Sequence, residues 1–269
     1  MKSIISKVLC TLLFGLFIVT SPAFAATHHV NCDKGKTISK ALETAKGSAQ
    51  VFEILVSGTC VEDVTIRRDN VYIVGNPDAT IEGFVRVFSS SGVSFENIAI
   101  SSQGNGLLVS GNANASLRWV QIRDNGGNGL MLRRRASVFV RDSTIENNGG
   151  FGVFVEDSSL QTNNSQIMGN ASYGIFADLG SQINLTTTEV AFNGAPGVQV
   201  MLHSVIDLRD GTYFHDNMFH GLYAVEDSAI RISAEDVIVD GNIGCEDNES
   251  SFANRGGASE ISTDCSDFN

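Results

Sequence analysis

A repeat of about 23 residues runs through the second half of this 269-residue chain and constrains its fold more than any other feature. Each unit carries a glycine followed by apolar residues at alternate positions, and successive glycines are 22 to 24 residues apart. The repeat glycines are Gly106, Gly129, Gly152, Gly174, Gly197 and Gly221. A unit this short cannot bury a core alone, so successive units must stack on one another.

Each repeat has room for three short strands. After the glycine comes an apolar-x-apolar run, then a second one such as Val138–Val140, then a single apolar position such as Ile145. Period-two runs broken by Gly, Asn, Asp and Ser indicate strands and turns rather than helices. Three strands per repeat predict one coil of a parallel β-helix. We expect an all-β, right-handed parallel β-helix of about nine or ten coils over residues 51–245.

An asparagine stands four residues before most of the repeat glycines. Stacked at one corner about 4.8 Å apart, such side chains can hydrogen-bond from coil to coil. Asparagine also tolerates a left-handed backbone, which such a corner can need. The column comprises Asn125, Asn148, Asn170, Asn193 and Asn217. We interpret it as structural rather than as a set of ligands.

The two ends of a β-helix expose strand edges that need covers. Residues 26–50 form the expected N-terminal cap, in which residues 37–46 have the apolar spacing of an amphipathic helix. Residues 246–269 are polar and form the expected C-terminal cap or tail. Outside the leader the cysteines cluster at the ends, at Cys32, Cys60, Cys245 and Cys265. Three pairings are open, and the local pairs Cys32–Cys60 and Cys245–Cys265 are favoured because the ends of a rod lie far apart.

Residues 1–25 have the charged start, short apolar stretch and Ala-Phe-Ala ending of a secretory signal peptide. This predicts a secreted or periplasmic protein, with no membrane span once the signal is cleaved. Export also favours disulfide formation. The net charge of −12 argues against a nucleic-acid partner, which would require a basic surface.

The segment from GKTISKALETAKG to VFEILVSGTCVEDVTIRRDNVYIVGNPDATIEG resembles the opening of pectin-lyase-like β-helix proteins. In these proteins a capping helix leads into the first coil. The Asn…Gly-Ile/Val units resemble the generic parallel β-helix repeat of the same superfamily, and together the resemblance covers about residues 30–245. It implies the fold but no particular activity. The motifs of pectinesterases, polygalacturonases and alginate epimerases are absent from the sequence.

The repeat register predicts which side chains share the outer face. The first and third positions after each glycine should point inward, and the second and fourth outward. The second position gives an apolar, partly aromatic column: Leu108, Met131, Phe154, Phe176, Gln199 and Tyr223. Because the apolar faces of sugar rings pack against aromatic rings, Met131, Phe154, Phe176 and Tyr223 are candidate ligand-binding residues.

Charged residues occupy the fourth position beside this column. Glu156 and Asp178 should be neighbours on adjacent coils, with Arg133 one coil away. Two close carboxylates can hold a hard cation such as Ca²⁺ or divide acid and nucleophile roles, so all three are candidate catalytic residues and the two acids candidate metal ligands. No cofactor is required by any motif. The alternative is that Arg133 and Glu156 are a cross-strand charge pair.

A further candidate lies in one late turn, where His215 and His220 flank Asn217. With Asp216 these histidines could bind a metal or transfer protons, and the alternative is an ordinary surface turn. Three functions therefore remain open. The first is a carbohydrate-interacting surface or periplasmic protein without catalysis. The second is a lyase or epimerase acting on a uronate polymer. The third is a structural or adhesive rod whose apolar column contacts another protein or a second copy.

Overall fold

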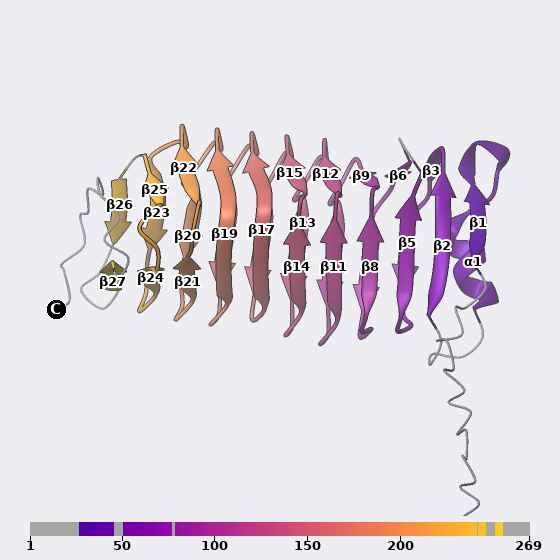
Figure 1. Cartoon of the computed structure of the whole chain (residues 1–269), viewed down its shortest axis with the longest axis horizontal. Coiled ribbons are helices and arrows are strands. Elements are labelled where there is room, and N and C mark those ends of the chain that lie inside the picture. Colours follow the sequence, from indigo (N-terminus) through magenta and orange to yellow (C-terminus); the bar gives the residue numbers. More distant parts are fainter. Residues whose placement is uncertain (1–26, 46–50, 77–78, 241, 246–250, 255–269) are drawn as a thin grey trace, which may run out of the picture.

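The chain winds into a parallel β-helix, as its repeat predicts (Figure 1). The computed structural model describes residues 27–45, 51–76, 79–240, 242–245 and 251–254. Each complete coil contributes one strand to a nine-stranded sheet and two strands, or one long bent strand, to an eighteen-stranded sheet. The strand pairs within the described residues are parallel, because each strand pairs with its counterpart one coil away. The expected signal peptide and most of the expected C-terminal cap lie outside the described residues.

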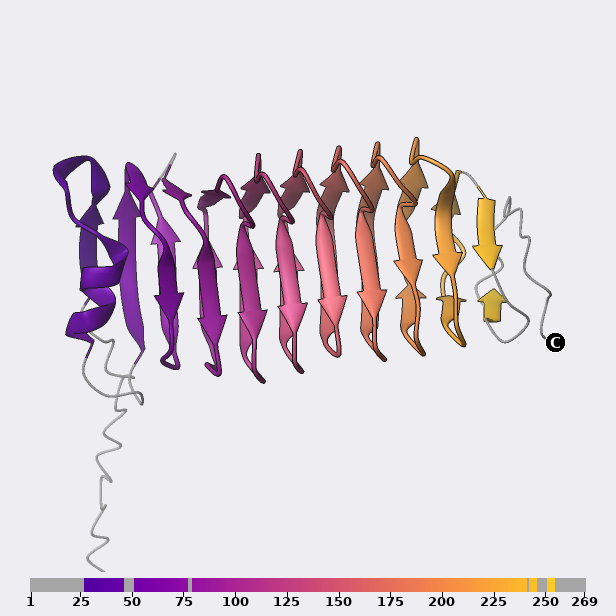
Figure 2. The ribbon, with the colours of Figure 1, turned by 180° about the vertical axis from the view of Figure 1, so that it is seen from behind.

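The nine-stranded sheet contains the strands that follow the repeat glycines, and it faces the viewer in Figure 2. Its strands are β4 (Val64–Ile66), β7 (Val85–Phe88), β10 (Leu107–Ser110), β13 (Leu130–Arg133), β16 (Val153–Glu156), β18 (Ile175–Asp178), β20 (Val198–Val200), β23 (His220–Ala224) and β26 (Asn242–Cys245).

The eighteen-stranded sheet has two limbs, because the chain turns once within it on each coil. The first limb contains β1 (His28–Asn31), β2 (Phe52–Ser57), β5 (Val71–Gly75), β8 (Val93–Glu96), β11 (Asn114–Arg118), β14 (Ser137–Arg141), β21 (Val205–Leu208), β24 (Ala229–Ile232), β27 (Ser251–Asn254) and the first halves of β17 (Ser159–Met168) and β19 (Gln182–Ala191). The second limb contains β3 (Thr59–Val61), β6 (Thr80–Glu82), β9 (Ala99–Ser101), β12 (Gln121–Arg123), β15 (Thr144–Glu146), the second halves of β17 and β19, β22 (Tyr213–His215) and β25 (Ile238–Val239). Strand β27 pairs with β24, so strand pairing reaches into residues that the sequence suggested as a cap.

The core is a continuous apolar column inside the coils. In β16, Val153 and Val155 are fully buried, whereas the alternate residues Phe154 and Glu156 are half-buried. After the other repeat glycines the first and third positions are likewise buried and face inward, and the second position is half-buried except at Met131, which is buried. Stacking buries each coil's apolar residues against those of the next coil, which is the main source of stability in such a fold.

The asparagine corner joins the second limb to the nine-stranded sheet. In the first four members of the column, from Asn125 to Asn193, Nδ2 donates to the Oδ1 of the asparagine on the next coil, over 2.8–3.0 Å. Each Oδ1 that accepts in this way also accepts from the backbone N–H of the preceding asparagine. The left-handed backbone falls one residue earlier, for example at Asp124 (φ 57°) and Asn147 (φ 55°). The column asparagines therefore serve as hydrogen-bonding groups, and their neighbours make the turn.

The N-terminal end is closed by a short helix, α1 (Ile38–Thr44), which packs beside β1 and β2 (Figure 1). The hydroxyl of Thr37 accepts from the N–H of Lys40, and Glu62 accepts from the N–H groups of Ile38 and Ser39. These bonds satisfy helix N–H groups that have no partner within the helix.

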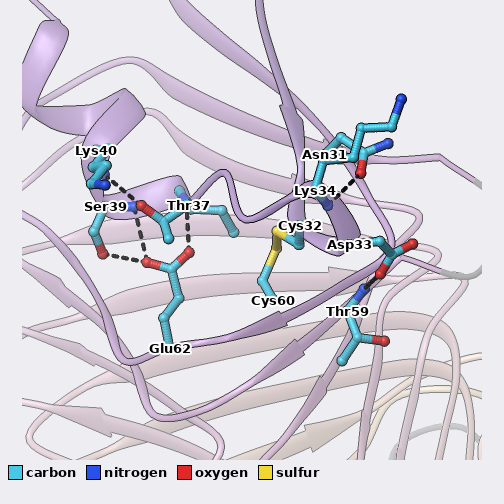
Figure 3. The surroundings of a disulfide bond; sticks show 11 residues. Asn31, Cys32, Asp33, Lys34, Thr37, Ser39, Lys40, Thr59, Cys60 and Glu62 are labelled. Carbon is cyan, nitrogen blue, oxygen red and sulfur yellow. Dashed lines mark hydrogen bonds between the residues drawn. A yellow bond between two sulfur atoms is a disulfide. The ribbon is translucent and has the colours of Figure 1, made fainter.

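A disulfide joins Cys32 to Cys60 beside this helix, with Cα atoms 5.0 Å apart (Figure 3). It links the 3₁₀ turn η1 (Cys32–Lys34) to β3, and Asp33 accepts from the N–H of Thr59 next to it. The first of the two favoured pairings is thus present. The second, Cys245–Cys265, involves side chains outside the described part of the chain.

Candidate functional site

The predicted apolar column lies in register on the outer face of the nine-stranded sheet. Neighbouring members pair from coil to coil in the order Leu108, Met131, Phe154, Phe176, Gln199 and Tyr223. We call these six residues the outer column. Phe154, Phe176 and Tyr223 are half-buried, whereas Met131 is only 9% exposed and offers little surface. The accessible members of the column are therefore its three aromatic residues together with Leu108 and Gln199, which are also half-buried.

Two further aromatic residues, Phe151 and Tyr173, complete a cluster of four rings on this face. Phe154 and Phe176 stack with centroids 5.9 Å apart and planes within 5°. Phe151 lies 5.2 Å from Phe176, and Tyr173 meets the same ring edge-on at 5.4 Å. Sequence reasoning missed both additional residues. They stand directly before Gly152 and Gly174, three positions before each column residue, in a turn that period-two reasoning does not cover.

The four rings support one another and still leave apolar surface on the outside. Each such aromatic contact contributes about 0.5–1.5 kcal/mol beyond simple burial. All four side chains remain half-buried rather than fully buried. The cluster is therefore a preformed apolar platform, held rigidly by strands that belong to adjacent coils.

Arg133, Glu156 and Asp178 form a row beside the platform, in the predicted register. The guanidinium of Arg133 donates to Oε2 of Glu156 at 2.6 Å and 3.1 Å, and it lies 5.3 Å from the centroid of Phe154. Asp178 accepts the N–H of Leu179 at 2.7 Å. Each carboxylate thus has a protein partner, and the ion pair is partly exposed, where such pairs contribute about 0–1 kcal/mol.

No third histidine, cysteine, aspartate or glutamate joins Glu156 and Asp178 in a close group in the described part of the chain. The single close group of three there is Cys32, Cys60 and Glu62, and its two cysteines form the disulfide. The sequence proposal of a Ca²⁺ site at Glu156 and Asp178 therefore rests on two carboxylates that are already hydrogen-bonded.

The two histidines considered together in the sequence lie on different sheets. His215, in β22, has its Nε2 2.8 Å from Glu189 and its Nδ1 2.8 Å from Asp216. Burial opposes protonation of this ring, but the hydrogen bonds to Asp216 and Glu189 outweigh it and raise the pKa of His215. The hydrogen bond from His215 lowers the pKa of Glu189. His220, in β23, instead stacks on Tyr223 at 4.9 Å.

The chain belongs to the right-handed β-helix family: a family model described as "Right handed beta helix region" matches residues 54–217. None of the curated protein sequences matches it. Within the described residues, no helix has the length and apolar character needed to cross a membrane.

Solved structures of the same architecture resemble the chain at low sequence identity. The pectate lyase Pel9A has a TM-score of 0.64 at 11% identity, covering 92% of this chain and 80% of its own. The A-module of the mannuronan C-5 epimerase AlgE6 from Azotobacter vinelandii has a TM-score of 0.52 at 11% identity, covering 89% of this chain and 97% of its own. The TM-scores establish a shared pectin-lyase-like fold. Sequence identities this low do not transfer an activity from these proteins to the chain.

Proposed function

We propose that the protein is exported and binds a polysaccharide along the outer face of the nine-stranded sheet, without catalysing a reaction. The observation that carries this proposal is the platform of Phe151, Phe154, Tyr173 and Phe176, half-exposed beside the row of charged residues. The C–H faces of sugar rings can bury apolar area on such a platform, while Arg133 and Asp178 can hydrogen-bond to hydroxyl or carboxylate groups.

The regular spacing of the coils favours an extended polymer as the ligand. Equivalent side chains recur about every 4.8 Å along the axis, so adjacent coils offer similar contacts to successive units of a chain. Two similar structures are named as a pectate lyase and a mannuronan C-5 epimerase, which supports a polysaccharide as the ligand class.

The bonding of the two carboxylates favours binding over catalysis. A general acid or nucleophile works best when its carboxylate faces the substrate with a suitable pKa. Glu156 is instead engaged by Arg133, and Asp178 by the backbone of Leu179. We interpret this row as a charged border of the binding platform.

The test is binding of the exported chain to immobilised polysaccharides, with product formation followed in the same samples. Polygalacturonate, alginate and a neutral xylan are the probes, each with and without Ca²⁺. Unsaturated products and new reducing ends report turnover. We expect binding without turnover, and a loss of affinity of about tenfold or more in Phe154→Ala.

Phe139→Ala is the matched control, because Phe139 is a 41% exposed phenylalanine on the first limb of the other sheet. Binding of polygalacturonate or alginate that survives Phe154→Ala and Phe176→Ala, or that fails equally in Phe139→Ala, contradicts the proposal. Turnover abolished by Glu156→Gln would instead establish an enzyme.

A further inference from the structure

A second surface suited to a ligand runs along the turn between the two limbs of the eighteen-stranded sheet. A groove of about 710 Å³ crosses five coils there, from Trp119 to Tyr213. We call it the limb groove. One wall is the outward column Thr144, Gln166, Glu189 and Tyr213, whose members pair in register from coil to coil. The other wall is the row of turn residues that begins with Trp119 and Asp142.

Trp119 is unusual for its position. Its backbone is left-handed (φ 53°), as at the equivalent Asn97, Asp142 and Asn164. Asparagine and aspartate adopt this conformation readily, whereas a bulky residue there is strained. Trp119 is 46% exposed, so core packing does not account for it, and Arg118 covers one face of its indole at 3.7 Å. The exposure and the fixed orientation of this indole therefore need another explanation.

Tyr213 is an equally well-held aromatic residue at the other end of the groove. Its ring stacks on His215 at 4.4 Å, and it is 37% exposed. His215 is itself fixed between Glu189 and Asp216. Glu189 in turn accepts from the amide of Gln166 at 2.7 Å. The polar groups of this wall are thus oriented before any ligand arrives.

We propose that the limb groove is a second carbohydrate-binding site, which takes a neutral oligosaccharide lying parallel to the helix axis between Trp119 and Tyr213. Its amide, hydroxyl and carboxylate side chains suit the hydroxyl groups of a sugar, and its aromatic ends suit the apolar ring faces. The residues that line the groove include the carboxylates of Asp142 and Glu189 and no lysine or arginine. Asp142 is paired with Arg141 and Glu189 with His215, so these lining residues offer the carboxylate of a uronate chain no unpaired cation. Four coil spacings span about 19 Å, long enough for several sugar units.

The test uses the tryptophan that the groove contains. The sequence has one tryptophan, so emission excited selectively from that residue reports on Trp119 alone. The full exported chain is titrated with neutral hexasaccharides of glucose, mannose and xylose, and with a galacturonate hexamer as the charged comparison. We expect at least one neutral hexamer to change Trp119 emission saturably at millimolar or lower concentration. The galacturonate hexamer should not do so.

Two variants locate the effect. Tyr213→Ala and Gln166→Ala remove exposed side chains at the far end and the middle of the groove, and each should raise the Kd by about tenfold. Phe154→Ala should leave the titration unchanged, since Phe154 lies on the other sheet. Circular dichroism checks that each variant is folded. The proposal fails if no neutral hexamer changes the emission, if the galacturonate hexamer acts equally well, or if both groove variants titrate like the parent. Because Phe154→Ala affects only the platform on the other sheet, a failure of the limb groove and a failure of the platform can be told apart.

Discussion

The side-chain amide of Asn148 donates to Oδ1 of Asn170 at 2.8 Å, and this bond links two coils that are 22 residues apart in the sequence. The same amide also donates to the carbonyl of Ile122 on the preceding coil. Both asparagines are 1% exposed. One buried side chain therefore connects three successive coils, and the column continues this pattern through the middle of the rod.

Replacing Asn148 by alanine should destabilise the protein substantially. The change removes the acceptor of the backbone N–H of Asn125 and one partner each from the side-chain amide of Asn125, the carbonyl of Ile122 and the amide oxygen of Asn170. Each unsatisfied buried group costs about 1–3 kcal/mol. Denaturant unfolding should therefore show a loss of at least this size. Asn184→Ala is the control, because Asn184 is half-buried on an outer face and should change the free energy of unfolding by less than about 0.5 kcal/mol. Equal effects of the two changes would refute the structural role of the column.

Replacing Gly152 by alanine should also destabilise the fold. An added Cβ would lie 2.5 Å from Nδ2 of Asn170 and 2.7 Å from the carbonyl oxygen of Gly174. Overpacking of this kind costs about 1–3 kcal/mol. Gly104→Ala is the matched control, because a Cβ there meets nothing within 4 Å. The midpoint of thermal unfolding should fall for Gly152→Ala and stay within error for Gly104→Ala. An unchanged unfolding midpoint for Gly152→Ala would mean that the coils can separate slightly at no cost in free energy.

Removing the disulfide with Cys60→Ser should lower the free energy of unfolding by about 2–4 kcal/mol. The bond ties the N-terminal turn to β3 across a separation of 28 residues. Thermal unfolding with and without reductant measures the effect, and reductant should lower the midpoint of the parent chain. If reductant lowers the unfolding midpoint of Cys60→Ser by a similar amount, part of the reductant effect on the parent chain belongs to Cys245 and Cys265.

The pair of His215 and Glu189 should stabilise the protein most between about pH 4.5 and 6.5, the ordinary pKa values of the two groups. The pKa of His215 is raised in the folded protein, so its contribution is complete below its ordinary pKa and is lost as pH rises through the folded value. The pKa of Glu189 is lowered, so its contribution is present above its ordinary pKa and is lost as pH falls through the folded value.

The difference in unfolding midpoint between the parent and His215→Gln measures this contribution. It should be largest near the middle of that window and shrink toward alkaline pH. A difference that is constant from pH 5 to pH 9 would show that His215 acts through packing on Tyr213 and Phe192 rather than through its charge.

Much of the architecture could be read from the repeat itself. The alternation after Gly152 predicted that Val153 and Val155 face inward and Phe154 outward, because a strand has a side-chain period of two. Stacking of equivalent positions then placed Phe154 beside Phe176 and Glu156 beside Asp178. The partner of Glu156 was harder to choose, since Arg133 and Asp178 are both one coil away and only side-chain conformation separates the two arrangements.

The sequence by itself determined the stacked coils, the inward apolar columns and the asparagine corner. Each of these follows from a periodicity that one coil shares with the next. Only the tertiary structure decided which outward side chains meet between different columns, as with Phe151 against Phe176, His215 against Glu189, or Trp119 and Tyr213 at the two ends of one groove. Those contacts depend on the path of the chain through its turns. The left-handed residues that set this path include Trp119 and Phe192 as well as asparagine and glycine.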